Sequence, residues 1–479
     1  MTPDSQLIRH AQAILTGLPG GAARAAGPDI RVRGGTIEAI GALQPLPGET
    51  TLDASDCVVY PAWINTHHHL FQSLLKGDPL GLNATLGPWL AATPLRFRAA
   101  FDGDLFRLSA RIGLLELALS GCGTVADHHY LAWPGMPFDA AAILFDEAES
   151  LGLRFVLCRG GGTRARLPEG RPVESLPPAA RPETLDGYLA DIERLAQRYH
   201  DPSPTAMRRI VVAPTSPPWS MTPDELRTCA DFARARGLRL HSHLSETVAY
   251  QDTVLAEHGM GPVQFCESVG WLGPDVWFAH LVRLDADEIA LLGATGTGIA
   301  HCAQSNGRLG SGIAPVRALQ DAGVPVSLGV DGAASNEAAD MVSEVHAAWL
   351  MQRARAGEAA LPVSRGGVGE HGADAATVED VVRWGTAGGA QVLGLPGTGT
   401  LAPGQAADIA LYALGDDPRY FGVHDVAAAP VVCAGAAKLR ALLVGGRTVV
   451  RDGAVPGLDV QAVGREARAA VATLIARTR

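Results

Sequence analysis

The stretch Pro61-Ala62-Trp63-Ile64-Asn65-Thr66-His67-His68-His69-Leu70 decides the interpretation of the fold. The apolar run Val58-Val59-Tyr60 precedes it and predicts a strand that leads into the histidines. Alternation along such a strand puts His67 and His69 on one face and His68 on the other. Two neutral imidazoles on one face at the end of a strand form half of a metal site. A local histidine cluster without a metal is the alternative.

Polar groups follow three further apolar runs, which makes the isolated cluster the weaker interpretation. Short apolar runs bounded by turn signals predict buried parallel strands. Catalytic groups at the C-terminal ends of several such strands are the layout of a TIM-barrel active site. The runs and the groups after them are Leu238-Arg239-Leu240 with His241 and His243, Val276 to Ala279 with His280, and Val324 to Val330 with Asp331.

The whole chain fits an enzyme with a barrel and a second, smaller unit. It has 479 residues, 47% hydrophobic residues and a formal net charge of −11, which argues against nucleic-acid binding. We find no uncharged apolar stretch long enough to span a membrane and no secretory signal at the N-terminus. The seven cysteines lack paired spacings, so free thiols and a cytoplasmic location are expected.

The predicted domains alternate along the chain. Residues 1–60 and 399–479 contain short strands with Gly-Gly hairpin turns, and we expect both chain ends to pair into one small β-sandwich. Residues 61–398 alternate strands and helices, which predicts an α/β barrel. An amphipathic helix is expected on the outside from about residue 459. Two long loops, Gly160 to Pro182 and Ala356 to Ala375, are expected on the catalytic face, as lids, substrate walls or disordered insertions.

With these residues identified, the chain resembles the amidohydrolase superfamily, in its branch of metal-dependent deaminases and triazine hydrolases. That resemblance implies a distorted TIM (β/α)8 barrel flanked by a β-sandwich. Ala62 and Ala303 stand where glycine and proline are usual, and neither change removes a ligand. The segments that carry the resemblance are Val59 to Leu70, His243 to Glu246, His301 to Asn306, Val330 to Asn336 and Gly404 to Ile409.

Other segments resemble the isoxanthopterin deaminases within that branch, while the 8-oxoguanine deaminases share the triple histidine. The resemblance implies metal-dependent hydrolytic deamination of a pterin, isoxanthopterin above all. The alternatives are an 8-oxoguanine or guanine deaminase, a triazine-type chlorohydrolase and a catalytically inactive metal-binding barrel. The resembling segments are Asn65 to Gly77, Val125 to His128, Gly135 to Asp139 and Asp417 to Gly422.

The resemblance assigns the metal to His67, His69, His243 and Asp331. One Zn²⁺ per chain is expected, and Fe²⁺ suits the same ligands. A zinc-type ion lowers the pKa of bound water to about 7. His241 shares a strand face with His243 and is the alternative ligand, but the resemblance puts the ligand three residues before the catalytic glutamate. Binuclear members of the superfamily commonly bridge their two metals with a carboxylated lysine on the fourth strand. This chain has no lysine near the fourth predicted strand, so the resemblance implies a mononuclear site.

Glu246 is the predicted proton shuttle, which takes a proton from water and gives it to the departing amine. His280 is predicted to lie beside the water and stabilise developing charge. Asp331 is predicted to be a catalytic residue as well as a metal ligand. A helix-start carboxylate and a core histidine are the alternatives for Glu246 and His280. His301 is expected to line the pocket at most.

Substrate contacts are predicted from the loops after the strands. Gln72 suits the amide-like edge of a pterin or purine, and Arg159 a ring oxygen. Trp89, Tyr130 and Trp133 are candidates for stacking on a flat heterocycle, with ordinary packing as the alternative. The expected partners are a small heterocyclic substrate and, from the resemblance, a second copy in a homodimer.

Overall fold

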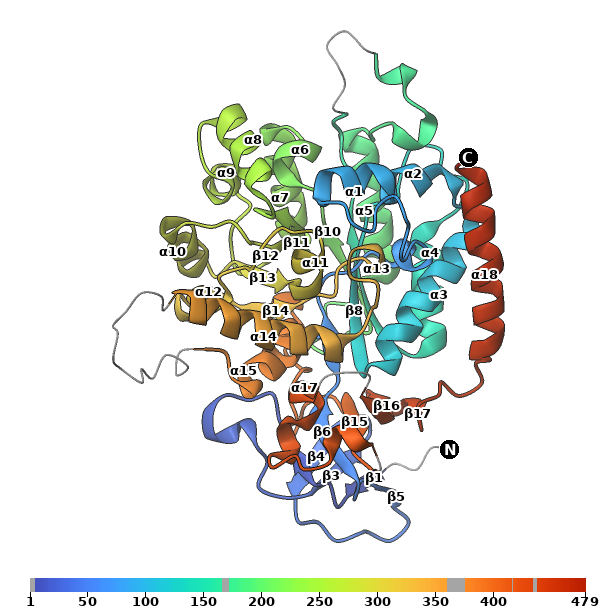
Figure 1. Cartoon of the computed structure of the whole chain (residues 1–479), viewed down its shortest axis with the longest axis vertical. Helices are drawn as coiled ribbons and strands as arrows, with labels where there is room; N and C mark the ends of the chain where they lie inside the picture. Colours follow the sequence, from blue (N-terminus) through green and yellow to red (C-terminus); the bar gives the residue numbers. More distant parts are fainter. Residues whose placement is uncertain (1–4, 166–171, 360–374, 416, 434–436) are drawn as a thin grey trace.

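The computed structural model describes residues 5–165, 172–359, 375–415, 417–433 and 437–479. Its centre is an eight-stranded parallel sheet whose strands follow chain order (Figure 1). The sheet closes where Thr66 N donates to Leu328 O over 3.0 Å, beyond the last pair of the ladder, so the barrel is distorted as expected. The strands are β7 (Trp63–Asn65), β8 (Cys122–His129), β9 (Arg154–Arg159), β10 (Arg208–Val212), β11 (Arg239–Leu244), β12 (Val276–His280), β13 (Gly298–His301) and β14 (Val326–Leu328).

The barrel strands are buried on both faces because helices cover them from outside. Every residue of β8, β9 and β12 is buried, which explains why the central residues of β9 and β12 are apolar without alternation. Local signals set the helix ends: the Asp102 side chain caps the first of the long helices, and Gly152 ends the next one with φ +77°. The covering helices include α3 (Gly103–Leu119), α4 (Ala140–Leu151), α5 (Leu185–Tyr199), α7 (Pro223–Ala235), α8 (Val248–His258), α9 (Pro262–Ser268), α10 (Ala286–Thr295), α12 (Val316–Asp321), α14 (Met341–Ala359), α15 (Val378–Arg383) and α16 (Gly389–Leu393).

The two chain ends form a separate pair of sheets below the barrel in Figure 1, as predicted. Their facing apolar side chains, Ile8, Ile30, Val59, Ile409 and Leu411 among them, make a core of their own. One sheet has the order β4 (Thr36–Gly41), β3 (Asp29–Arg33), β1 (Ser5–Arg9), β5 (Thr50–Asp53); the other has the order β17 (Arg447–Arg451), β16 (Lys438–Val444), β15 (Ile409–Ala413), β6 (Cys57–Pro61), β2 (Ala13–Ile14).

The strand predicted at Val58-Val59-Tyr60 is present, but it does not continue into the histidines as expected from the sequence. This run lies in β6, where Val59 pairs with Leu411 of β15 in the sandwich. A separate short strand, β7, starts at Trp63 and pairs with β8. The residues that follow β7, including His67 to His69, have irregular backbone.

The last helix, α18 (Val460–Arg477), packs on the outside of α3, as its amphipathic sequence predicts. The Arg477 guanidinium donates to Ala100 O over 2.7 Å and to Asp102 Oδ2 over 2.8 Å. None of the described helices is long and apolar enough to cross a membrane. Of the two predicted long loops, residues 166–171 and 360–374 lie outside the described residues.

Candidate active site

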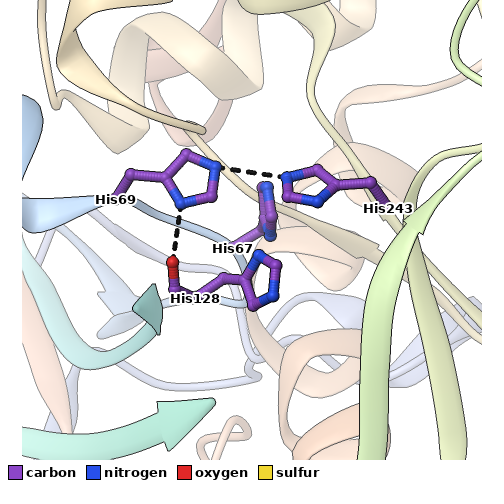
Figure 2. Close-up of side chains that lie close together, drawn as sticks. All are labelled: His67, His69, His128 and His243. Atoms are coloured by element: carbon purple, nitrogen blue, oxygen red, sulfur yellow. Dashed lines mark hydrogen bonds between the residues drawn. The ribbon is translucent and has the colours of Figure 1, made fainter. Parts of the chain in front are cut away.

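Histidines that follow β7 and lie at the end of β11 come together at one end of the barrel (Figure 2), where Asp331 joins them. The Nε2 atoms of His69 and His243 are 3.2 Å apart. Asp331 Oδ1 lies 3.3 Å from His67 Nε2 and 3.1 Å from His69 Nε2. All four side chains proposed as metal ligands from the sequence are therefore brought together.

The hydrogen bonds of His69 and His243 define which ring nitrogen carries the proton. His69 Nδ1 lies 2.7 Å from His128 O, and His243 Nδ1 lies 2.6 Å from Thr215 O. A carbonyl oxygen only accepts, so each Nδ1 is the donor and each neutral ring has an unprotonated Nε2. Those two lone pairs face each other across the 3.2 Å gap.

A relay of two buried rings gives His67 the same tautomer. His241 Nδ1 lies 2.9 Å from Trp277 O and is therefore the donor. Its Nε2 accepts from His67 Nδ1 over 2.8 Å, which leaves His67 Nε2 unprotonated. No described group donates a hydrogen bond to that atom.

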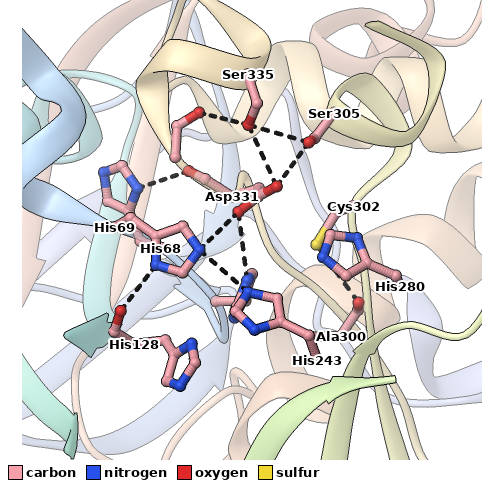
Figure 3. Close-up of polar contacts among 12 residues, drawn as sticks. His68, His69, His128, His243, His280, Ala300, Cys302, Ser305, Asp331 and Ser335 are labelled. Atoms are coloured by element: carbon pink, nitrogen blue, oxygen red, sulfur yellow. Dashed lines mark hydrogen bonds and ion pairs between the residues drawn. The ribbon is translucent and has the colours of Figure 1, made fainter. Parts of the chain in front are cut away.

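Asp331 presents one oxygen to the histidines and has the other one saturated (Figure 3). Its Oδ2 accepts from Ser305 Oγ over 2.6 Å and from Ser335 Oγ over 3.2 Å. Two hydroxyl donors on Oδ2 favour the ionised form of the Asp331 carboxyl. The carboxylate is thus charged, with Oδ1 as its free acceptor.

These atoms form a set of three nitrogen lone pairs and one anionic oxygen with no proton among them. Burial lowers the pKa of His67 and of His243 well below the usual value, so protonation does not relieve their repulsion near neutral pH. A divalent cation does, and the donor set of imidazoles with a carboxylate suits zinc or ferrous iron. The residues present therefore fit a metal ion.

His128 is an additional ring in this cluster that the sequence did not assign. His67, His69, His128 and His243 offer ligand atoms within 4.8 Å of one another, as do His67, His243, His280 and Asp331. His128 Nε2 lies 2.9 Å from Ala213 O, while its buried Nδ1 has no partner among the described groups. Its position at the end of β8 was the signal in the sequence that could have identified it.

The fourth strand of the barrel, β10, contains no lysine, in agreement with the observation from the sequence on which the expected mononuclear site rests.

Replacement of His241 by leucine is expected to weaken metal binding without removing a proposed ligand. His67 Nδ1 then loses its acceptor, and loss of such an outer hydrogen bond typically lowers metal affinity by about 10–100-fold. Metal content after dialysis against graded chelator measures this. His301→Leu is the matched control, because His301 is equally buried and neither ring nitrogen has a described partner. Equal metal affinity in the two variants would contradict the relay.

Glu246 and His280 lie beside the cluster at the ends of β11 and β12. Glu246 Oε2 is 3.7 Å from His280 Nε2, and Oε1 accepts from Ser311 Oγ over 3.0 Å. His280 Nδ1 lies 2.9 Å from Asn306 Oδ1. Burial raises the pKa of Glu246 above its usual value, with the charge of His280 acting in the opposite direction. A carboxyl with a raised pKa can both accept and release a proton near neutral pH.

A cavity of about 240 Å³ opens over these groups. Of the residues predicted to contact substrate, Trp89 and Tyr130 line it. Gln72 lies behind Tyr130 and donates from Nε2 to its hydroxyl over 2.9 Å. Arg159 and Trp133 line a different cavity, where Arg159 forms ion pairs with Glu183 at 2.6 Å and Asp191 at 2.9 Å.

Several lining residues were not found by sequence reasoning. Most of them belong to no recognisable sequence motif, because their loops come together over the barrel only in the folded protein. Trp219 could have been considered from its position, since it lies in the segment that follows the C-terminal end of β10. The α1 (Leu86–Ala92) and α2 (Pro94–Phe97) segment supplies Leu86, Leu90 and Leu95. The other unassigned residues of the wall are Arg98, Thr215, Ser216, Trp219, Tyr250 and Leu309.

Comparison with known proteins agrees with this geometry. The chain is 63% identical over 477 residues to an isoxanthopterin deaminase from an unknown prokaryotic organism, which covers 99% of this chain and 98% of the relative. It is 41% identical to 8-oxoguanine deaminase of Pseudomonas aeruginosa, over 94% of this chain and 96% of that protein.

Solved structures show the same fold over nearly the whole chain. An amidohydrolase from an environmental sample of the Sargasso Sea has a TM-score of 0.85 at 56% identity and covers 99% of both chains. A zinc complex of atrazine chlorohydrolase from Arthrobacter aurescens has a TM-score of 0.87 at 28% identity, covering 97% of this chain and 100% of that one. The model of the amidohydrolase family matches residues 58–449, so the chain belongs to the amidohydrolase family.

Proposed function

We propose that the enzyme hydrolyses the exocyclic amine of a pterin, isoxanthopterin above others, and releases ammonia. The observation that carries this proposal is the 63% identity to an isoxanthopterin deaminase along nearly the whole of both chains. The second candidate substrate is 8-oxoguanine, supported by the 41% identity to a deaminase of that purine. Both reactions replace an amine on a flat heterocycle by an oxygen from water.

We propose further that His67, His69, His243 and Asp331 hold one Zn²⁺ per chain, with Fe²⁺ as the alternative. The convergence of their unprotonated atoms supports this ligand set. A cation held there supplies the Lewis acidity that makes water nucleophilic near neutral pH.

Glu246 is proposed to move the proton between water and the leaving amine. Its carboxyl lies on the cavity wall, and burial raises its pKa, so the proton can be held at Oε2 before transfer. His280, 3.7 Å from that oxygen, orients it and stabilises negative charge that develops on the attacked ring. Ser311 holds the other carboxyl oxygen at 3.0 Å.

Trp89 and Tyr130 are proposed to stack against the heterocycle in the cavity. Gln72 fixes the Tyr130 hydroxyl from behind. Direct contacts of Gln72, Arg159 and Trp133 with the substrate stay predictions from the sequence, as do the homodimer and the cytoplasmic location.

Ammonia release from isoxanthopterin, pterin, 8-oxoguanine, guanine and a chlorinated triazine, measured in parallel with zinc-loaded enzyme, tests the function. We expect the efficiency with isoxanthopterin to exceed that with the purines by about tenfold or more, a discrimination of about 1.4 kcal/mol in transition-state binding. A preference for 8-oxoguanine would refute isoxanthopterin as the substrate but would still support hydrolytic deamination as the reaction. Chloride release from the triazine without ammonia from the others would overturn the deaminase itself. No turnover by metal-loaded enzyme would support an inactive barrel.

A further inference from the structure

Arg98 is a partly buried arginine on the cavity wall that forms no ion pair with any residue the structure describes. It opens the short helix η3 (Arg98–Ala100) directly after α2. Its guanidinium donates to Ala132 O and lies 5.7 Å from the centre of the Trp133 ring. The Nε atom is buried without a hydrogen-bond partner, and no carboxylate of the described residues lies within ion-pair distance.

Neighbouring arginines are paired, which makes Arg98 different from them. Arg96, on the same segment, binds Asp78 Oδ1 at 2.8 Å. Arg159 is held by Glu183 and Asp191. Glu183 also acts on Arg98 at longer range, but its two oxygens are hydrogen-bonded to Arg159. Removing a guanidinium from water without a paired charge costs free energy. We therefore expect an oxygen of a bound ligand to accept hydrogen bonds from Arg98.

Arg98 lies where the reaction cavity joins a second one. Arg98, Tyr130, Thr215 and Trp219 line both the cavity over Glu246 and an adjoining cavity of about 170 Å³. Arg164 and Arg181 also line the adjoining cavity. Among the described residues that line the reaction cavity, Arg98 is the only arginine or lysine, and it lies on the side that opens towards Arg164, Arg181 and Glu183 of the adjoining cavity.

We propose that Arg98 donates hydrogen bonds to an oxygen on the substrate ring that does not bear the leaving amine. This inference rests on the proposed function, which orients the amine towards Glu246 and the metal ligands. Isoxanthopterin carries an oxygen on its pyrazine ring, and pterin has a hydrogen there. Arg98 therefore determines the preference for the oxygenated pterin, because a site built to bind an oxygen discriminates against an analogue that lacks it.

Arg98→Met tests this with two substrates that differ by that one oxygen. Hydrogen bonds from a charged donor are typically worth enough for about a 10–100-fold effect, so kcat/KM for isoxanthopterin is expected to fall by that factor. For pterin the change is expected to stay within about threefold. Arg98→Lys should keep part of the preference because it retains the charge but not the fork of donors. Arg96→Gln is the matched control, since it removes a guanidinium from the same segment outside the cavity wall.

Equilibrium binding followed by pterin fluorescence separates this inference from the proposed function. If the wild type releases no ammonia but binds isoxanthopterin more tightly than Arg98→Met does, the proposed function is refuted and the inference about Arg98 is supported. Equal losses for both pterins in Arg98→Met, in kcat/KM and in Kd, would make Arg98 a structural residue and overturn the inference. So would unchanged values for both. If Arg98→Met does not fold, Arg98→Gln, which keeps a donor for Ala132 O, replaces it with the same criteria.

Discussion

Glu246→Gln is expected to lower kcat for isoxanthopterin by about a thousandfold, within the range of about 10²–10⁴ that a positioned acid–base group contributes. The amide has nearly the shape of the carboxylate and can still accept from Ser311 Oγ. The amide cannot take up and release a proton, so the leaving amine is no longer protonated by a general acid. Metal content should stay at the wild-type level, because Glu246 is outside the proposed ligand set. Single-turnover ammonia release and metal analysis of the same sample measure both quantities.

Ser311→Ala is the control for the position of the Glu246 carboxyl. It removes the 3.0 Å hydrogen bond to Oε1 but leaves the acid–base group, so we expect a loss of only about tenfold, the value of one ordinary hydrogen bond. Near-normal turnover in Glu246→Gln would refute the proton shuttle. Equal losses in the two variants would mean that Glu246 acts mainly by its geometry.

Asp331→Asn is expected to weaken metal affinity by more than about 100-fold, beyond the effect of losing an outer hydrogen bond. The variant removes the only negative charge from the proposed ligand set and can turn an NH₂ group towards the lone pairs of His67 and His69. Activity should fall with metal occupancy and recover in part at high zinc concentration. Metal content after dialysis, and activity as a function of added zinc, measure this effect.

Ser335→Ala is the matched control for Asp331→Asn. It removes the longer of the two hydroxyl bonds to Oδ2, at 3.2 Å, and keeps the charge and Oδ1, so metal affinity should fall by about tenfold or less. Full metal content and turnover in dialysed Asp331→Asn would exclude Asp331 as a ligand.

The barrel and the polar groups at its strand ends could be predicted because both depend on local sequence. Buried strands such as β12 are apolar throughout, and His280 stands at the point where that run ends. Local sequence also explains why the strand at Val58 to Tyr60 was expected to lead directly into His67, although β6 and β7 are separate strands. Val58 to Tyr60 is as apolar as a barrel strand, because the sandwich buries it equally well, and composition does not distinguish the two environments.

Tertiary pairings account for what the sequence could not provide. The relay from His67 through His241 to Trp277 O joins the segment after β7 to β11 and β12, and no spacing in the chain reveals it. Arg159 and Arg98 illustrate the same limit. Arg159 is the last residue of β9 and Arg98 the first residue of η3. Acidic partners that are distant in sequence bind Arg159, whereas Arg98 has none among the described residues.

The pairing of β6 with β15 has a consequence for synthesis of the chain. Val59 can pair with Leu411 only after the C-terminal part of the chain has been synthesised. The same holds for the hydrogen bond of 2.6 Å from Trp63 Nε1 to the Tyr412 hydroxyl. At translation rates of about 5–20 residues per second, the interval is about 20–70 seconds. During that time Val59 and Trp63 lack these native partners. Metal loading is therefore expected after release from the ribosome, and chaperone protection of residues 57–69 should matter most before it.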